Sequence, residues 1–147
     1  MSQPAQHILS ISASCACRRT SVRIEGPVLS MFMCACQDCQ RATGTGHSTV
    51  VMVLNSAFSI TGEPAVFDRP TESGATLSQH FCPGCGTPLY SQSSRAPDIR
   101  LIPVGLFAGH NDWFVPQHLI FARRHQVWDV IDADIPQHQR YPGRSGS

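Results

Sequence analysis

The grouping of the seven cysteines constrains this 147-residue chain more than any other feature of its sequence. They form three short motifs: Cys15-x-Cys17, Cys34-x-Cys36-x-x-Cys39 and Cys82-x-x-Cys85. The first residues lack the basic and apolar segments of a secretory signal, so we expect a reducing, cytoplasmic environment, where disulfides are unfavourable. An odd number of cysteines would also leave one without a disulfide partner. Metal binding or thiol redox chemistry therefore fits the motifs better than a disulfide framework.

Composition excludes several classes of protein. The chain is long enough for one domain, and 41% of its residues are hydrophobic, which is enough to build a core. No apolar run approaches the roughly 20 residues that a membrane-spanning helix needs, so we expect no membrane insertion. The formal net charge is +1 and the basic residues are scattered, which argues against nucleic acid as a partner. Small molecules are the expected partners, and the pattern fixes no oligomeric state.

The hydrophobic pattern is typical of short strands separated by glycine and proline. The predicted strands are 9–13, Thr20–Glu25, Val28–Met33, His47–Leu54, Phe58–Ile60, Ala65–Phe67, Thr76–Phe81, Pro88–Ser91, Ile99–Val104 and Leu119–Phe121. Only Gln37–Ala42, ended by Gly44, and Leu106–Asn111 favour helix. The sequence therefore predicts a mainly β domain of several small coiled antiparallel sheets, with very little helix. It covers residues 1–135 and is followed by a polar C-terminal tail, 136–147.

Zinc takes four thiolate or imidazole ligands in structural sites, and three protein ligands with one open position in catalytic sites. Pro83 and Gly84 allow a tight turn that brings Cys82 and Cys85 onto one ion. Cys15 and Cys17 face the same side if this segment is an extended strand. Together these two pairs predict a closed four-cysteine site that joins the start of the chain to its middle and stabilises the fold.

The remaining three cysteines can surround a second ion. Cys34 and Cys36 share a face at the end of a predicted strand, and Cys39 follows Cys36 by about one helical turn. Three ligands leave one coordination position open, as in a catalytic zinc site. Two alternatives stay open at this point: His47 or His80 closes the site as a fourth ligand, or the three cysteines form a metal-free redox triad.

The chain resembles the glutathione-dependent formaldehyde-activating enzyme family over roughly residues 12–131. The motifs that carry the resemblance are Cys15-Ala16-Cys17 with Val22-Arg23, Cys34-Ala35-Cys36-Gln37-Asp38-Cys39-Gln40-Arg41 with Thr43-Gly44, Phe81-Cys82-Pro83-Gly84-Cys85-Gly86-Thr87, and Pro116-x-His118 with Trp128. The sequence departs from the family pattern at Arg18, where glycine is frequent, and at Ala35, where histidine is frequent. The pair Arg123-Arg124 stands where serine and lysine are frequent.

The resemblance implies a zinc protein with a β-tent type of fold and two Zn²⁺ ions per chain. It implies a structural zinc on Cys15, Cys17, Cys82 and Cys85, and a catalytic zinc on Cys34, Cys36 and Cys39. The implied activity is that of a carbon–sulfur lyase, in which a zinc-bound thiol, glutathione or a similar one, adds to formaldehyde or another small aldehyde, or the reverse. A small thiol and a small aldehyde are then the partners.

Two residues near the triad are candidates for assisting this chemistry. His47 is a candidate for proton transfer, and Arg41 is a candidate for holding a carboxylate of the thiol co-substrate. The chain has no lysine, which excludes a Schiff base to the aldehyde through a lysine side chain. Two other functions remain as alternatives: a non-catalytic two-zinc binding module, and a thiol redox or zinc-release protein that uses Cys34, Cys36 and Cys39.

Overall fold

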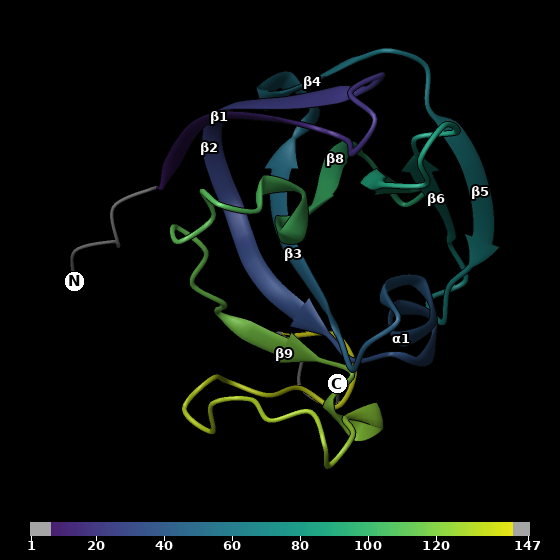
Figure 1. Ribbon diagram of the computed structural model, residues 1–147. Coiled ribbons are helices and arrows are strands. Elements are labelled where there is room, and N and C mark those ends of the chain that lie inside the picture. Colours follow the sequence, from purple (N-terminus) through teal and green to yellow (C-terminus); the bar gives the residue numbers. More distant parts are fainter. Residues whose placement is uncertain (1–6, 143–147) are drawn as a thin grey trace. The chain divides into compact units, whose positions relative to one another are not determined.

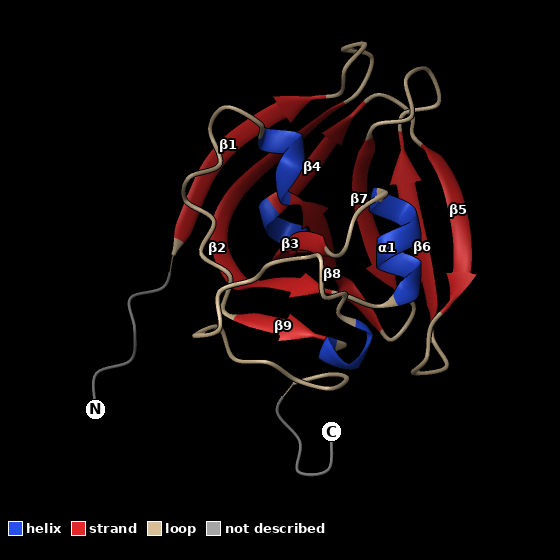
Figure 2. Ribbon diagram, turned by 60° about the horizontal axis from the view of Figure 1, so that its bottom comes forward, coloured by secondary structure: helices blue, strands red, loops and turns tan. Residues whose placement is uncertain are grey.

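The computed structural model describes residues 7–142, and strands dominate its regular structure (Figures 1 and 2). The strands are β1 (Ile8–Ser14), β2 (Ser21–Cys34), β3 (Ser48–Leu54), β4 (Phe58–Thr61), β5 (Ala65–Pro70), β6 (Thr76–Phe81), β7 (Pro88–Ser93), β8 (Ala96–Pro103) and β9 (His118–Ile120). One α-helix, α1 (Gln37–Thr43), lies within the described residues. The mainly β fold with very little helix, predicted from the sequence, is therefore confirmed.

Three single turns of 3₁₀-helix complete the elements: η1 (Asn55–Ala57), η2 (Val104–Phe107) and η3 (Ala122–Arg124). The second helical stretch predicted from the sequence, Leu106–Asn111, is wrong in type and position, because only the short turn η2 forms there. The helix α1 forms where it was predicted. It ends at Gly44, whose φ of 73° lies in the left-handed region that glycine adopts without strain.

The described chain forms two compact units. The first contains residues 7–29 and 51–111, and the second contains residues 30–50 and 112–142. Strands β2 and β3 each begin in one unit and end in the other, so the units share two strands. The four cysteines of the first and third motifs belong to the first unit, and Cys34, Cys36 and Cys39 belong to the second.

The strands are hydrogen bonded in the order β1-β2-β3-β8-β7-β6-β5, and β4 and β9 pair with different parts of β2. Pairing is antiparallel between β1 and β2, between β2 and β4, and along β5, β6, β7 and β8. Strand β9 is parallel to the end of β2, with Cys34 opposite Ile120. This pairing brings the residues after β9 to the second cysteine motif.

Strand β2 is a single strand of 14 residues, and the prediction that Gly26-Pro27 divides it was wrong. Pro27 lies opposite Ile8 in the pairing with β1, and the hydrogen-bond ladder resumes at Val28, whose N–H donates to the carbonyl of His7. Gly26 has a φ of 148°, and a Cβ there would lie 2.8 Å from the Cβ of Ala57. Gly26 is therefore required by the close approach of η1 and does not end the strand.

The core of the first unit follows from alternation along its strands. On β2, Val22 and Ile24 are buried while Arg23 and Glu25 are exposed, as expected where successive side chains face opposite sides. Fully buried apolar side chains of this unit also come from β3, β7, β8 and η2: Val51, Val53, Leu89, Ile102 and Phe107.

Two small apolar clusters lie among the described residues of the second unit. One contains Met33, Ala35 and Leu119, with Phe114 and Ile131 among the residues packed against it. The other contains Cys34, Ile120 and Phe121, with Phe32, Cys36 and Cys39 packed against it. The second cluster matters for function because all three cysteines of the second motif take part in it.

The described part of the C-terminal segment, residues 136–142, pairs with β9 and the residues after it. The N–H groups of Leu119 and Phe121 donate to the carbonyls of Pro136 and Arg140, and the N–H of His138 donates to the carbonyl of Leu119. Backbone hydrogen bonds thus hold this segment to the strand despite its polar composition. Residues 143–147 of the tail lie outside the described residues.

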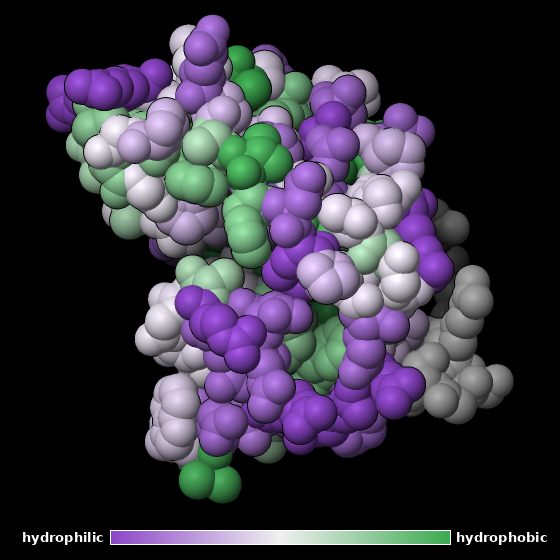
Figure 3. Space-filling view, turned by 90° about the vertical axis from the view of Figure 1, so that its right-hand side faces the viewer, coloured by the Kyte–Doolittle hydropathy of each residue, from purple (hydrophilic) through white to green (hydrophobic). Residues whose placement is uncertain are grey.

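Hydrophilic and hydrophobic residues are mixed on the face shown in Figure 3, and hydrophobic residues gather there only in small, separate groups. None of the helices within the described residues is long and apolar enough to cross a membrane.

Candidate metal centres

Two hairpin turns carry the first and third cysteine motifs. Residues 15–20 join β1 to β2, and residues 82–87 join β6 to β7. In the second turn the N–H of Cys82 donates to the carbonyl of Thr87, and the N–H of Gly86 donates to the carbonyl of Cys82. This is the tight turn that Pro83 and Gly84 predict, and we call it the knuckle. Its last turn residue, Gly86, has a φ of 77°, which favours glycine.

The first motif forms a turn and not the extended strand that we predicted. Strand β1 ends at Ser14, and the N–H of Arg18 donates to the carbonyl of Cys15. Arg18 has a φ of 68°, in the left-handed region that glycine adopts without strain. The turn still places both sulfurs on one side, because it folds back toward Cys82.

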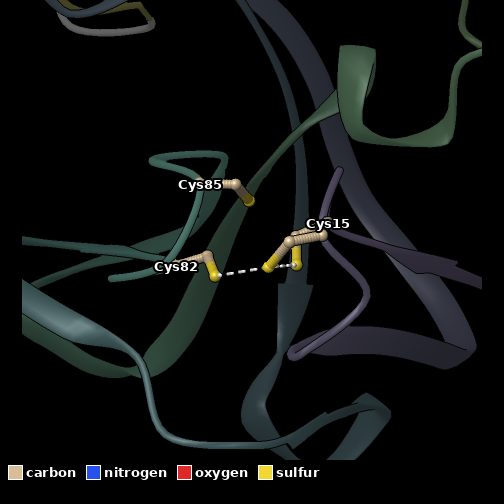
Figure 4. Close-up of side chains that lie close together, drawn as sticks. Cys15, Cys82 and Cys85 are labelled. Atoms are coloured by element: carbon tan, nitrogen blue, oxygen red, sulfur yellow. Dashed lines mark hydrogen bonds between the residues drawn. The ribbon is translucent and has the colours of Figure 1, made fainter.

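The four sulfur atoms of Cys15, Cys17, Cys82 and Cys85 lie within 4.8 Å of one another. The sulfur of Cys17 is 3.6 Å from that of Cys15 and 3.5 Å from that of Cys82. The three labelled side chains converge in Figure 4. A tetrahedral zinc with Zn–S bonds of about 2.3 Å requires sulfur–sulfur distances of about 3.8 Å. The donor set and its spacing therefore fit one tetrahedral ion.

Thr87 connects the two turns. Its hydroxyl accepts a hydrogen bond from the N–H of Ala16 at 3.2 Å and lies 3.2 Å from the sulfur of Cys85. In the sequence, Thr87 is recognisable only as the last residue of the Phe81–Thr87 motif. Its role as a link between the cysteine pairs depends on contacts across 71 residues.

Hydrogen bonds, burial and neighbouring thiols shift the pKa values of three of these cysteines. Thr20 lowers the pKa of the Cys15 thiol to about 5, and Thr87 lowers that of Cys85 to about 7. The N–H of Arg19 lowers the pKa of Cys17, but burial and the neighbouring thiols outweigh it and raise that pKa to about 11. Burial and the neighbouring thiols thus oppose the ionisation of Cys17, and a bound divalent cation would remove that opposition.

The second motif lies at the junction between β2 and α1, as predicted. Cys34 is the last residue of β2, and Cys36 is the N-cap of α1 with an extended backbone. The sulfur of Cys36 accepts a hydrogen bond from the N–H of Cys39 at 3.3 Å. The three sulfurs lie within 4.8 Å of one another, and only these three cysteines form the group within the described residues.

Apolar side chains pack against the triad of Cys34, Cys36 and Cys39, and we call the two buried ones, Ile120 and Phe121, the apolar floor of the triad. Ile120 and Phe121 are 8% and 6% exposed and belong to the same cluster as Cys34, which is 6% exposed. Contacts with the thiols of Cys36 and Cys39, together with burial, raise the pKa of Cys34. A divalent cation bound by the triad would favour the thiolate form and so oppose this shift.

Neither histidine considered as a fourth ligand belongs to this group. The Nδ1 of His47 is 2.6 Å from a carboxylate oxygen of Asp129. His80 is in the first unit, where its ring stacks on Tyr90 at 4.1 Å and burial lowers its pKa. Within residues 7–142, the triad therefore offers three candidate metal ligands, and no histidine, cysteine, aspartate or glutamate joins the group as a fourth.

The other candidate residues lie around α1 and β9. Arg41 is 75% exposed and its guanidinium is 3.2 Å from the carboxylate of Asp38. Gln40 donates from its amide to the carbonyls of Ala35 and Arg124, so it holds η3 against the start of α1. Arg123 on η3 lies with its guanidinium carbon 5.8 Å from the centre of the Phe121 ring.

Sequence reasoning missed Phe121 and Asp129. Phe121 has a φ of 56°, an uncommon conformation for a bulky residue, and it packs in the cluster of the triad. Asp129 contacts His47 across 82 residues. No local signal marks either residue, because aromatic and acidic residues are common in loops of any function.

Comparison with known proteins gives two findings. The family described as glutathione-dependent formaldehyde-activating enzyme matches residues 10–124 of this chain. Among solved structures, a crystal structure of a Rhodobacter sphaeroides protein is similar, with a TM-score of 0.55 and 17% sequence identity over 70% of this chain and 93% of that one. At this identity the second likeness concerns the fold.

Proposed function

Because the chain belongs to the glutathione-dependent formaldehyde-activating enzyme family, we propose that it is a zinc-dependent carbon–sulfur lyase. It joins the thiol of glutathione, or of a similar small molecule, to formaldehyde or another small aldehyde, and it also catalyses the reverse cleavage. The observation that carries this proposal is the difference between the two cysteine groups. One has four ligands and the other has three.

The four-ligand group is suited to a structural ion, since every position of a tetrahedral zinc is filled by protein. The three-ligand group is suited to an ion that takes part in a reaction. When bound by Cys34, Cys36 and Cys39, zinc would supply an open position for a thiol and lower the pKa of that thiol.

The residues around the triad support a thiol as the co-substrate. The apolar floor of Ile120 and Phe121 limits the access of water to Cys34, which favours an addition of sulfur to carbon over hydrolysis. Arg41, on the exposed side of α1, is available to bind a carboxylate of glutathione in competition with its exposed contact to Asp38, which is weak. His47 is the residue we assign to proton transfer.

The first test of the proposal is metal content and thiol binding. Protein purified under reducing conditions should hold two zinc ions per chain. After replacement of zinc by Co²⁺, glutathione should change the visible absorption of the wild type and of Cys85→Ser, but not of Cys36→Ser. A non-catalytic binding module should show no change with glutathione, and a redox triad should hold one zinc ion and form a disulfide on oxidation.

The second test is turnover. Exchange between formaldehyde and its glutathione adduct, followed by NMR, should be faster with the zinc protein than without it. Arg41→Gln should raise KM for glutathione with little change in kcat. Arg23→Gln is the matched control, because Arg23 also makes an exposed contact with a nearby carboxylate, that of Glu25. Equal KM values for the two variants would remove Arg41 from the proposal.

A further inference from the structure

A nearly buried carboxylate lies between two histidines in the second unit. The Oδ2 of Asp129 is 2.6 Å from Nδ1 of His47 and 3.7 Å from Nε2 of His125. The side chain of Asp129 is only 11% exposed, and that of His47 is 19% exposed. A carboxylate in such a place needs hydrogen bonds to replace water, and His47 supplies a short one.

Gly46 shows that the place of this carboxylate is built into the fold. A Cβ on Gly46 would overlap the carboxylate and the Cβ of Asp129. Gly46 does not have a positive φ, so its backbone conformation is one that other residues adopt. The glycine therefore leaves space for Asp129 directly beside His47.

The backbone around Asp129 is also fixed. The ring of His125 donates from Nε2 to the carbonyl of Asp129 at 2.5 Å, and the N–H of Asp129 donates to the carbonyl of Gln126 at 3.1 Å. These bonds define a turn that directs the Asp129 side chain inward. Its neighbours Trp128 and Val130 are 62% and 91% exposed, so packing of this loop does not explain the burial of Asp129.

The contact with Asp129 decides which nitrogen of His47 carries the hydrogen. A carboxylate oxygen only accepts, so Nδ1 of His47 donates, and Nε2 of the neutral ring keeps its lone pair. The Nε2 atom has no hydrogen-bond partner within residues 7–142. His47 is thus prepared to accept a proton at Nε2.

His47 is connected to the triad through α1. The hydroxyl of Thr43 donates to the carbonyl of Cys39 at 2.8 Å and lies 3.5 Å from the carbonyl of His47. The side chain of Ser48, which follows His47, lies beside the thiol of Cys39. The His47 segment therefore borders the triad on the side where α1 ends.

We propose that Asp129 is a positioning residue, which holds His47 so that Nε2 takes the proton of the thiol co-substrate and returns it to the aldehyde oxygen. This inference rests on the proposed function. In the forward step the S–H bond breaks and its proton goes to Nε2. The sulfur forms a bond to the carbonyl carbon, the π bond of the carbonyl breaks so that its electron pair goes to oxygen, and Nε2–H gives its proton to that oxygen. The product is a hemithioacetal, and no oxidant or reductant is consumed.

The test is Asp129→Asn in the full zinc-loaded chain, assayed with glutathione and formaldehyde. Asparagine has the same shape, so it fits beside Gly46, but its amide donates to Nδ1 and moves the hydrogen of His47 to Nε2. We expect kcat to fall by roughly 10²-fold, the lower end for loss of a general base, with KM for glutathione little changed. His47→Asn should give a similar loss, and the double variant should lose no more than either single one.

Long-range ¹H–¹⁵N NMR of the imidazoles gives a readout that a purely structural role would not link to kcat. It should show Nδ1–H on His47 in the wild type and Nε2–H in Asp129→Asn. Asp134→Asn, an exposed aspartate of the same segment, is the matched control and should change neither tautomer nor kcat. Thermal melting checks that each variant is folded at the assay temperature.

Three results would overturn the inference. They are full kcat in Asp129→Asn, additive losses in the double variant, and an Nε2–H tautomer already present in the wild type. If the wild type itself showed no turnover of any thiol with any aldehyde, the proposed function would fall, and with it the role of Asp129. If the wild type turned over and Asp129→Asn kept its full rate, only the inference about Asp129 would fall.

Discussion

Loss of the ion from the four-cysteine group should cost far more stability than loss of the ion from the triad. The first ion would join two turns that are far apart in sequence, since Cys17 and Cys82 are separated by 65 residues. The second would join residues within one strand-to-helix junction, Cys34 to Cys39. The perturbation is a matched pair of substitutions, Cys85→Ser and Cys36→Ser.

The magnitude follows from the length of chain that each ion closes. A cross-link across 65 residues restricts the unfolded chain by about 4 kcal/mol at 25 °C. For a chain of this size that corresponds to a fall in Tm of roughly 10–15 °C. Closing the six residues from Cys34 to Cys39 restricts few conformations, because the junction is already compact. Cys36→Ser also preserves the helix cap, since serine is a favoured N-cap residue.

The assay is thermal and urea unfolding of each zinc-loaded variant, with metal content measured on the same samples. Cys85 is exposed and Cys36 is half-buried, so neither substitution removes much packing. Addition of a strong zinc chelator to the wild type should lower Tm by about as much as Cys85→Ser does. Equal losses in the two variants, or a metal-free wild type that melts with the metal-loaded one, would refute the reasoning.

Three further expectations concern the backbone and pH. Arg18→Gly should raise the free energy of unfolding in urea by about 1 kcal/mol, because glycine adopts the left-handed conformation of this position without strain. Arg18→Ala should give no such gain. An equal gain in both variants would contradict the idea that the backbone of Arg18 is strained. Gly46→Ala should destabilise by about 1–3 kcal/mol through overlap with Asp129, whereas Gly105→Ala, where the added Cβ meets nothing within 4 Å, should leave Tm nearly unchanged. Burial and His138 lower the pKa of His118 in the folded state. The neutral His118 side chain therefore contributes its full stability above the ordinary histidine pKa of about 6.5, and this contribution is lost as pH falls through the lower pKa of the folded state. His118→Gln should reduce the decrease in Tm between pH 7.5 and pH 5.5. An unaltered decrease would show that His118 does not cause it.

Local features were the most predictable part of the fold and the site. The knuckle at Cys82–Gly86 and the short helix after Cys36 depend on turn and capping residues that act within a few positions of sequence. The division of the cysteines into four and three follows from their spacing and agrees with the two groups in the structure. Two local predictions were wrong in conformation: Leu106–Asn111 forms no helix beyond the turn η2, and Cys15-x-Cys17 is not extended, because a turn also brings both sulfurs to one side.

Long-range contacts account for what the sequence did not reveal. The continuity of β2 through Gly26-Pro27 depends on its pairing with β1 and on the approach of Ala57. The floor of the triad requires β9 to lie parallel to the end of β2, which brings Phe121 to Cys34. No hydrophobic pattern specifies which of several short strands become neighbours.

The sequence by itself determined the chemistry available to this protein: seven thiols in groups that match a four-ligand and a three-ligand metal site, on a mainly β chain without lysine. The tertiary structure decided how that chemistry is supported. It places Asp129 against His47, 82 residues away in sequence, and Gly46 leaves the space that Asp129 occupies. Within the described residues it brings no fourth candidate ligand to the triad. The physical reason is that ligand spacing is fixed by a few backbone angles, whereas the surroundings of a site depend on how distant segments pack.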